Sequence, residues 1–461
     1  MRRTAITRTT VTAVALALGA PLVTGPAPAA AVQDAHVEGV WRSDGYGAVY
    51  AIDEGRLREF QTTAAGCLPG ATAQRTGSGR RASYTAEDGT VLDVRPGKLR
   101  VAGSPGVRGL RRLSALPAEC TRPAPSGPLA TFDVFWQTFE ENYPFFAAKG
   151  IDWHAVRDRH RPRISGRTTD EELFAVLSDM VRPLYDAHVR ITAGKDRFFF
   201  EKRPGTEIPG PELDQRVKAH IERRDLGGRP LQEFAGGRIG YSDLPGGQGY
   251  LRVTGFGGYT DADPETYDDC SAALDRALDA VFTRERTARL KGLIIDLRIN
   301  GGGSDSLGLR LAGRLTDRTH FAYAKRARNH PSDAARFTHP QPQYVHPARG
   351  PRYTGPVAVL TGGSTVSAGE TVTQALMDRP GRTVRIGAPT QGVFSDVMPR
   401  VLPNGWQLML PNEEFRTRTG RTFDGPGIPP HLTEPVFTDE EFDRNRDSAF
   451  DRAVSVLRLS R

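Results

Sequence analysis

Residues 357–378 constrain the fold more than any other stretch of the chain, because they predict a strand, a tight turn and a helix in direct succession. Residues 357–360 are a short apolar run typical of a buried strand, residues 361–364 favour a turn, and residues 368–377 repeat apolar side chains at helical spacing. Ser367 therefore falls where the helix begins. A hydroxyl in that place lies beside unpaired backbone N–H groups, which can stabilise negative charge.

Ser367 has two interpretations on this segment alone. With Glu370 it satisfies the S-x-x-E capping box, in which the serine caps the helix and the glutamate reaches back to the serine backbone. Alternatively, its hydroxyl is a catalytic nucleophile. The segment itself does not decide between the two, so the decision depends on the rest of the chain.

A second succession of strand, turn and helix lies upstream. A buried strand over 293–297 leads into the glycine-rich turn 300–304 (NGGGS), and a helix follows over 307–315. Glycines let the backbone approach a ligand closely and let its N–H groups point at an anion. The turn is not a dinucleotide fingerprint, because Ser306 stands where G-x-G-x-x-G requires glycine, and no phosphate-loop lysine is present. A plain glycine-rich turn is the alternative.

The remaining chain divides by its pattern. Residues 36–115 alternate short strand-like pieces with turn residues, and a proline-rich joint follows at 117–128. Two amphipathic helices come next, and His188 lies where the second of them gives way to a short strand. We expect an α/β protein organised as a signal peptide (1–31), a small β module (32–120), a helical subdomain (129–192), a connecting segment (193–235), an α/β core (236–440) and a C-terminal helix (441–461).

The N-terminus predicts export. Three arginines among the first ten residues precede an apolar run over 11–23, and residues 27–31 (APAAA) suit signal peptidase. We expect a secreted, extracellular protein without a stable membrane anchor, since no later stretch approaches the roughly 20 apolar residues of a membrane span. Removal of residues 1–31 lowers the net charge from +8 to +5. With its arginines scattered, the chain is not expected to bind nucleic acid; its oligomeric state stays open.

Three cysteines in an exported chain predict one disulfide and one free thiol. Cys67 and Cys120 bracket a turn-rich segment and are expected to pair. Cys270 lies in a helical pattern with no histidine nearby in the sequence, so we expect a buried apolar residue rather than a nucleophile. The histidines of the proline-rich stretch 330–346 do not match zinc-motif spacing, and no metal or other cofactor is expected.

Three motifs together resemble those of a known family. Residues 296–303 (DLRINGGG) resemble the D-x-R-x-N-x-G-G segment of the tail-specific, or C-terminal-processing, serine peptidases. Residues 367–370 (SAGE) are similar to the nucleophile motif of that family, and residues 387–390 (GAPT) to the Gly-x-Pro-Thr turn that follows it. The resemblance covers about residues 130–435. It implies a crotonase-like (ClpP/crotonase) core with a helical subdomain, and hydrolysis of peptide bonds without a cofactor.

The general base depends on the branch of this family. One branch places a lysine just beyond the Pro-Thr turn, but no lysine follows Lys325 in this chain. The other branch, similar to the tricorn core protease and the interphotoreceptor retinoid-binding proteins, places a histidine at the end of the helical subdomain, which corresponds to His188. The resemblance thus implies that His188 accepts the proton of Ser367, a role that suits a group titrating near neutrality.

The same resemblance implies the other site residues. The oxyanion hole would consist of the backbone N–H of Ala368 and that of Gly302 or its neighbour Gly303. Asp424 corresponds to the acidic residue that orients the histidine, although the family usually has glutamate there. Asp186 or a water in that role, and a purely structural turn at Asp424, stay as alternatives.

Two functions from different classes follow. The first is a secreted serine peptidase that acts on a peptide or protein substrate through Ser367 and His188. The second is a non-catalytic binding protein for apolar or peptide ligands on the same fold, as the resemblance to retinoid-binding proteins allows. Acyl-CoA chemistry on a crotonase-like fold ranks last, because the chain is exported and carries the serine motif.

Overall fold

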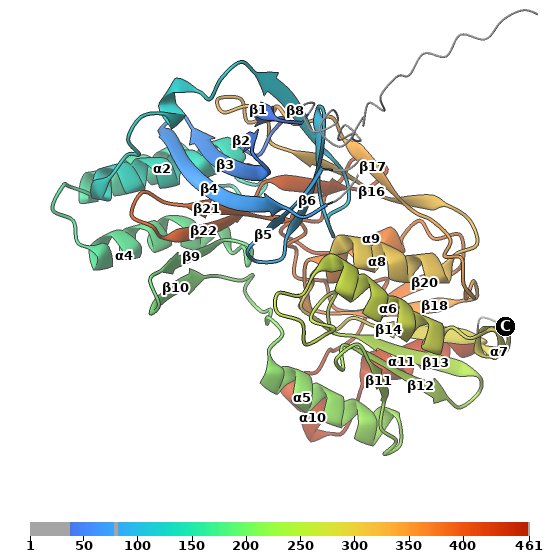
Figure 1. Cartoon of the computed structure of the whole chain (residues 1–461). Coiled ribbons are helices and arrows are strands. Elements are labelled where there is room, and N and C mark those ends of the chain that lie inside the picture. Colours follow the sequence, from blue (N-terminus) through green and yellow to red (C-terminus); the bar gives the residue numbers. More distant parts are fainter. Residues whose placement is uncertain (1–36, 78–81, 460–461) are drawn as a thin grey trace, which may run out of the picture.

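The computed structural model describes residues 37–77 and 82–459, and the predicted signal peptide lies outside them. The described chain forms an N-terminal barrel, a helical part with its own sheet, and an α/β part built on a larger sheet (Figure 1). No helix within these ranges is long and apolar enough to cross a bilayer.

Eight antiparallel strands close the N-terminal barrel, so the predicted β module is confirmed. Alternate side chains point inward and form one apolar core, with Trp41, Tyr50 and Tyr84 among its largest members. Pairing of the first strand with the eighth leaves no open edge. The strands are β1 (Gly39–Ser43), β2 (Ala48–Asp53), β3 (Arg56–Thr63), β4 (Gly66–Arg75), β5 (Ala82–Ala86), β6 (Val91–Arg95), β7 (Lys98–Val101) and β8 (Arg108–Leu113).

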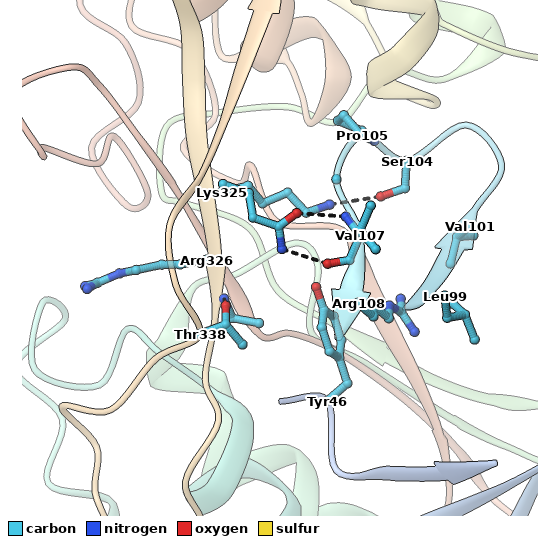
Figure 2. Close-up of a pocket in the computed structure, with 13 residues that line it drawn as sticks. Tyr46, Leu99, Val101, Ser104, Pro105, Val107, Arg108, Lys325, Arg326 and Thr338 are labelled. Atoms are coloured by element: carbon cyan, nitrogen blue, oxygen red, sulfur yellow. Dashed lines mark hydrogen bonds between the residues drawn. The ribbon is translucent and has the colours of Figure 1, made fainter. Parts of the chain in front are cut away.

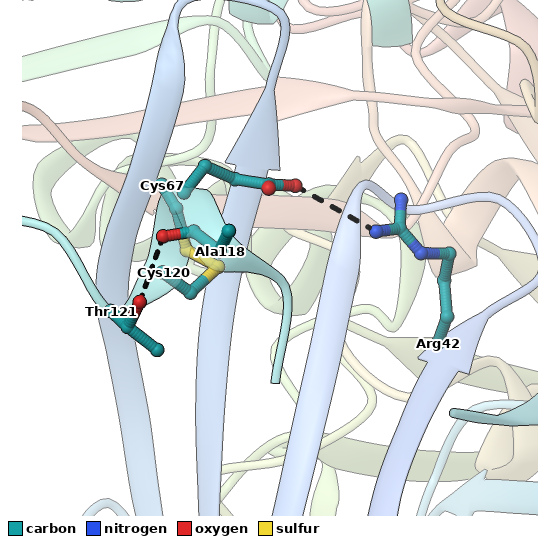
Figure 3. The surroundings of a disulfide bond; sticks show 6 residues. Arg42, Cys67, Ala118, Cys120 and Thr121 are labelled. Atoms are coloured by element: carbon teal, nitrogen blue, oxygen red, sulfur yellow. Dashed lines mark hydrogen bonds and ion pairs between the residues drawn. A yellow bond between two sulfur atoms is a disulfide. The ribbon is translucent and has the colours of Figure 1, made fainter. Parts of the chain in front are cut away.

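A disulfide ties the exit of the barrel back to a barrel strand. Cys67 of β4 and Cys120 of the short helix η1 (Ala118–Cys120) form it, which is the pairing expected from the sequence (Figure 3). Nearby, Arg42 and Glu119 approach to 3.9 Å, but both side chains are more than a third exposed, and such pairs add little stability. Cys270 is buried and unpaired, also as expected.

The helical part packs its helices on one face of a four-stranded sheet. The predicted apolar stripe of the first helix, including Phe132, Phe135 and Phe139, is fully buried. Thr169 and Glu172 form a capping box at the start of the second predicted helix. The elements are α2 (Gly127–Asn142), α3 (Trp153–His160), η2 (Arg161–Arg163), α4 (Asp170–Val181) and η3 (Arg182–Leu184).

The sheet of the helical part combines two segments that lie far apart in the sequence. Its strand order is β10-β9-β22-β21. The hairpin of β9 (Arg190–Ala193) and β10 (Arg197–Phe200) follows the helices, whereas β21 (Val397–Val401) and β22 (Gln407–Pro411) come from the region expected to belong to the α/β core. The apolar face of both hairpins packs on the same helices, which accounts for their union.

The α/β part is built on a seven-stranded sheet of order β11-β12-β13-β14-β18-β20-β24, parallel from β13 to β24. Helices cover both faces, so its central strands are apolar throughout. The strands are β11 (Gln232–Phe234), β12 (Ile239–Leu244), β13 (Gln248–Val253), β14 (Gly292–Asp296), β18 (Val357–Thr361), β20 (Thr383–Gly387) and β24 (Leu432–Thr433). The helices are α5 (Pro211–His220), η4 (Ile221–Asp225), α6 (Tyr267–Val281), α7 (Arg284–Arg289), α8 (Asp305–Ala312), η5 (Gly313–Leu315), α9 (Ala368–Ala375), α10 (Asp439–Asp443) and α11 (Ser448–Arg458).

One contact of the barrel with the rest of the chain is the loop between β7 and β8; Tyr46 and Leu68 of the barrel also pack in the apolar cluster of the helical part. A three-stranded sheet of order β17 (Gln341–Val345), β16 (His320–Ala327) and β23 (Glu413–Arg416) meets this loop. Lys325 Nζ donates to Asp396 at 2.7 Å. Lys325 Nζ also donates to Ser104 Oγ at 2.9 Å, and the Gln341 amide bonds both backbone groups of Val107 (Figure 2). The cavity between them, of about 20 Å³, is just large enough for one water molecule.

We expect loss of the disulfide to destabilise the fold, because the bond spans 53 residues and restricts the unfolded chain. The double variant Cys67→Ser/Cys120→Ser should lose about 2–4 kcal/mol in the free energy of unfolding. Denaturant unfolding followed by circular dichroism measures the difference. Reductant should destabilise the wild type and leave the double variant unaffected; equal stability of the two proteins in oxidising buffer would contradict this contribution.

Candidate active site

Two short parallel strands bring the two predicted turns side by side. β15 (Ile299–Asn300) follows β14, β19 (Ser364–Thr365) follows β18, and the two strands pair in parallel. Because β14 and β18 are parallel neighbours, their carboxyl ends meet at one edge of the sheet, where α/β proteins usually bind ligands. The pairing carries the glycine-rich turn after β15 next to Ser367, which lies after β19.

The side chain of Asn300 fastens the glycine-rich turn. Its Oδ1 accepts from Gly302 N at 3.0 Å, and its Nδ2 donates to the Val253 carbonyl at 2.8 Å. Its backbone carbonyl accepts from Val366 N at 2.9 Å. Gly302 has φ +85°, and a β-carbon there would lie 2.6 Å from the β-carbon of Ser367. Only glycine fits this close approach, and the Gly302 N–H is already engaged.

Ser367 occupies a strained turn at the start of α9. Its φ of 54° and ψ of −118° are unusual for a residue with a side chain. Ser367 and Glu370 have the placement of a capping box, but the Ser367 hydroxyl makes no cap hydrogen bond, because the Glu370 N–H donates to the Ser367 carbonyl at 2.7 Å. The hydroxyl is half-buried and is not consumed by the helix.

The Glu370 side chain fixes the serine turn through hydrogen bonds. Its buried carboxylate accepts from Ser367 N at 3.1 Å, from Gly392 N at 2.6 Å and from Val393 N at 2.9 Å. Burial raises the pKa of Glu370 to about 7, although these three N–H donors oppose the rise. The glutamate half of the capping box thus links the serine turn to the segment after the Gly-x-Pro-Thr turn.

Two backbone N–H groups at these turns have no acceptor within the described chain, namely those of Gly303 and Ala368. Gly303 lies opposite Phe256. The Phe256 N–H donates to the Gly302 carbonyl and the Phe256 carbonyl accepts from Ser304 N, so neither group bonds the Gly303 N–H. Ala368 is the first residue of α9, where backbone N–H groups lack helical partners. Of the three residues expected at an oxyanion hole, Gly302 is therefore engaged, and the other two are available.

His188 lies in the turn between η3 and β9. Its side chain is buried, and its Nδ1 has no hydrogen-bond partner in the described residues. Asp186 Oδ1 accepts from His188 N at 3.1 Å, and Asp186 Oδ2 accepts from the Tyr143 hydroxyl at 2.8 Å. Burial lowers the pKa of His188 below its ordinary value of 6.5, and the negative charge of Asp186 opposes this. The imidazole is thus held neutral.

A small apolar cluster joins the histidine turn to the serine turn. Ala187, Val366 and Val393 are buried together, with Ile208 packed against them. Because Ala187 directly precedes His188 and Val366 directly precedes Ser367, the two turns touch through these neighbours. The structure therefore brings the sequence neighbours of the two predicted residues into one cluster, although they come from different parts of the fold.

Asp424 lies in the same region without a hydrogen bond to His188 in the described chain. Its carboxyl accepts from Phe394 N at 3.2 Å and from Thr422 Oγ1 at 2.5 Å. Burial raises the pKa of Asp424 well above its ordinary value, and the nearby Asp186 adds to this. The sequence pattern offered Asp424 as the orienting acid, whereas Asp186 has the direct contact with the histidine turn. Tyr143, which holds Asp186, gave no signal in the sequence.

The segment after β10 crosses the serine turn. Arg203 donates to the carbonyls of Thr390 and Gln391 at 2.6 and 3.0 Å, and Ser364 Oγ donates to the Glu207 carbonyl at 2.7 Å. These contacts fasten the connection between the helical part and the α/β part beside the site. In residues 37–77 and 82–459, no group of three or more His, Cys, Asp and Glu side chains is arranged to hold a metal ion.

Comparisons with known proteins agree with this geometry. Residues 247–433 match the model of peptidase family S41, and residues 129–182 match that of the tricorn protease C1 domain. The first match includes both turns and the second covers most of the predicted helices, so the resemblance expected from the motifs is confirmed. A search of curated proteins finds no match.

Two solved structures have a similar fold. One is a protein from Parabacteroides merdae, provisionally described as a peptidase, with 24% sequence identity over 72% of this chain and 97% of its own, at a TM-score of 0.60. The other is mature CPAF complexed with lactacystin, with 15% identity over 72% of this chain and 98% of its own, at a TM-score of 0.50.

The two acids near the histidine can be distinguished by titration. We expect Asp186→Asn to lower the pKa of His188 further, because it removes the negative charge that favours the imidazolium. Asp424→Asn is the matched control and should have a smaller effect, since burial raises the pKa of that carboxyl and so favours its neutral form. NMR titration of the imidazole signals measures both. A larger shift in the Asp424 variant would identify Asp424 as the orienting acid.

Proposed function

From the premise that residues 247–433 belong to peptidase family S41, we propose that the protein is a secreted serine peptidase with Ser367 as nucleophile and His188 as general base, on a crotonase-like core. One observation carries the proposal. The unused hydroxyl of Ser367 lies on a strained strand-to-helix turn beside two unengaged backbone N–H groups. A strained turn of this kind is how other hydrolases expose a serine nucleophile.

The reaction follows from these groups. Ser367 Oγ attacks the carbonyl carbon of the scissile bond while its proton passes to His188, and the carbonyl electron pair moves onto the oxygen. The imidazolium then gives the proton to the leaving amine as the C–N bond breaks. Water hydrolyses the acyl-enzyme by the same steps, with His188 again accepting the proton.

The N–H groups of Ala368 and Gly303 are the donors we assign to the oxyanion. Gly302 is the weaker candidate, because its N–H already bonds Asn300 at 3.0 Å. Removal of one such donor typically costs about 10²- to 10³-fold in rate. Position 303 also has no room for a side chain, because a β-carbon there would lie 2.2 Å from the Phe256 carbonyl oxygen.

We assign Asp186 the task of orienting His188, with Asp424 in a supporting position. Asp186 accepts a hydrogen bond from the backbone of His188 and one from Tyr143, which together fix the turn that carries the imidazole. Asp424 remains the residue that the family pattern offers. Its raised pKa supports a smaller electrostatic contribution to the imidazolium.

Export is proposed from the predicted signal peptide, and the Cys67–Cys120 disulfide is compatible with an oxidising compartment. The alternative function, a non-catalytic binding protein for apolar or peptide ligands, has one observation in its favour: within the described chain no group accepts a hydrogen bond from His188 Nδ1. An imidazole whose Nδ1 has no acceptor is less well oriented for proton transfer.

Replacement of the nucleophile tests the proposal directly. We expect Ser367→Ala to lower hydrolysis of a fluorescein-labelled casein by a factor of about 10³ to 10⁶, and to abolish labelling by a fluorophosphonate probe. Ser364→Ala is a matched control from the same turn and should keep labelling, because the Ser364 hydroxyl bonds the Glu207 carbonyl. Undiminished cleavage by Ser367→Ala would reject the assignment, and a wild type that neither cleaves nor labels would favour the binding protein.

The pH dependence tests the base. His188 accepts a proton only when neutral, and its pKa lies below 6.5. We therefore expect kcat/KM to fall as the pH is lowered, with an inflection below pH 6.5, and to be level above it. Initial rates with one peptide substrate between pH 4.5 and 8.5 measure this. An inflection above pH 7 would show that a group other than this buried histidine limits the rate.

A further inference from the structure

An exposed apolar surface covers one side of the four-stranded sheet next to His188. We define the aromatic face by Phe198 and Phe200 of β10, Met409 of β22 and Val401 of β21. Their exposed fractions are 55%, 39%, 36% and 37%. The alternate residues of the same strands, such as Phe199, are buried against the helices. On the open side these apolar residues alternate with Arg190, Thr192 and Gln407, so that side is partly apolar, and only the other side is covered.

The strand register places Phe198 and Phe200 side by side on β10, where their rings are 5.6 Å apart. Phe200 lies opposite Arg190 and Phe198 opposite Thr192, so these two residues of β9 separate the phenylalanines from Met409 of β22. A further exposed aromatic residue, Tyr185, lies three residues before His188. Exposed apolar patches usually mark interaction sites.

The aromatic face continues into the proposed active site. β9 begins two residues after His188, and its first residue pairs with Phe200. Beyond Phe200 the chain runs into the segment that contacts the carbonyls of Thr390 and Gln391 through Arg203 and the serine turn through Glu207. Because Arg190 at the start of β9 pairs with Phe200 at the end of β10, the Phe200 end of the face leads to both the histidine turn and the serine turn.

β10 is also an edge strand of its sheet, without a strand on its outer side in the described residues. An edge strand offers backbone N–H and C=O groups to an extended chain, and the neighbouring side chains decide which chain is preferred. A lipid surface would use the apolar side chains but not the backbone edge. The combination of an open edge with an apolar face that leads to the active site favours an extended polypeptide.

We propose that the aromatic face binds an extended, apolar stretch of the polypeptide substrate and delivers the chain to Ser367. The proposal rests on the proposed peptidase function and specifies its substrate class. Folded proteins bury their apolar side chains, so a peptidase with this surface selects unfolded or partly unfolded chains over folded ones.

The test measures binding without turnover. In a Ser367→Ala background, the double variant Phe198→Ser/Phe200→Ser is compared with the unmodified face for binding of a labelled, reduced and carboxymethylated α-lactalbumin, which stays unfolded. Fluorescence anisotropy should show a Kd raised about tenfold or more, because two half-exposed phenylalanines lose their apolar contact area. Tyr344→Ser is the matched control. Tyr344 is 44% exposed on β17 of another sheet, and its loss should leave the Kd unchanged.

Catalysis gives a second readout. With Ser367 intact, the double variant should raise KM for the unfolded protein more than for a four-residue fluorogenic peptide, which is too short to reach along the strand. Thermal unfolding of each variant establishes that the fold is retained. A double variant with wild-type Kd, or with equal losses for the long and short substrates, would overturn the proposal.

The same variants also test two other occupants of the aromatic face. If the double variant loses binding to phosphatidylcholine/phosphatidylglycerol vesicles but keeps its Kd for the unfolded protein, the face is a lipid-binding surface and the proposal fails. If sedimentation shows a wild-type dimer that the double variant dissociates, with an unchanged Kd, the face is a subunit interface and the proposal fails. Hydrolysis by Ser367→Ala would instead reject the peptidase assignment, while the anisotropy result would still stand.

Discussion

The parallel pairing of β15 with β19 is the contact on which the rest of the candidate site depends. Only Ile299↔Ser364 and Asn300↔Thr365 are paired, yet this register sets Gly302 against Ser367. Buried charges fix the direction of the first strand: Arg298 is fully buried and bonds Asp296 at 2.7 Å and Asp447 at 2.6 Å. Removing one partner of such a group leaves an unpaired buried charge and typically costs about 3–5 kcal/mol. The Asp and Arg of the D-x-R-x-N motif therefore hold the scaffold, and its Asn holds the turn.

The N-terminal barrel also contacts the glycine-rich turn. The Gly103 carbonyl accepts from Ser304 Oγ at 2.7 Å and from Ser306 N at 3.2 Å, directly after Gly303. The next residue, Ser104, shares Asp396 with the buried Lys325. Lys325 stays charged there, because Asp396 and Glu413 raise its pKa against the effect of burial. The N-terminal module thus supports the glycine-rich turn of the candidate site through polar contacts, while Tyr46 and Leu68 of the barrel pack into the apolar cluster of the helical part.

The sequence pattern predicted those parts of the fold whose side chains repeat at a regular spacing. The strands at 293–297 and 357–360 were predicted because apolar residues alone define them. β4 is the opposite case, because Pro69 and two glycines interrupt its pattern. The pairing of β22 with β9 depends on a shared apolar face and leaves no local signal. In the site, motif spacing predicted Ser367 and His188, but the choice between Gly302 and Gly303 depends on where the Asn300 side chain bonds, which spacing cannot show.

Burial of the His188 imidazole explains why the helical half and the α/β half contribute different groups to the candidate site. A charged His188 would lose its hydration in this place, so burial favours the neutral form. If His188 takes the proton of Ser367 as proposed, the positive charge that forms needs a negative partner already in position. Asp424 serves poorly, because its own burial favours the neutral acid. Asp186 accepts hydrogen bonds from Tyr143 and from the histidine backbone, which preorganise its charge beside the ring. In the proposed mechanism the helical half therefore supplies both the base and its counter-charge, and the α/β half supplies the nucleophile and the oxyanion donors. An apolar cluster of Ala187, Val366 and Val393 excludes water where the two halves meet, so each half strengthens the electrostatics of the other.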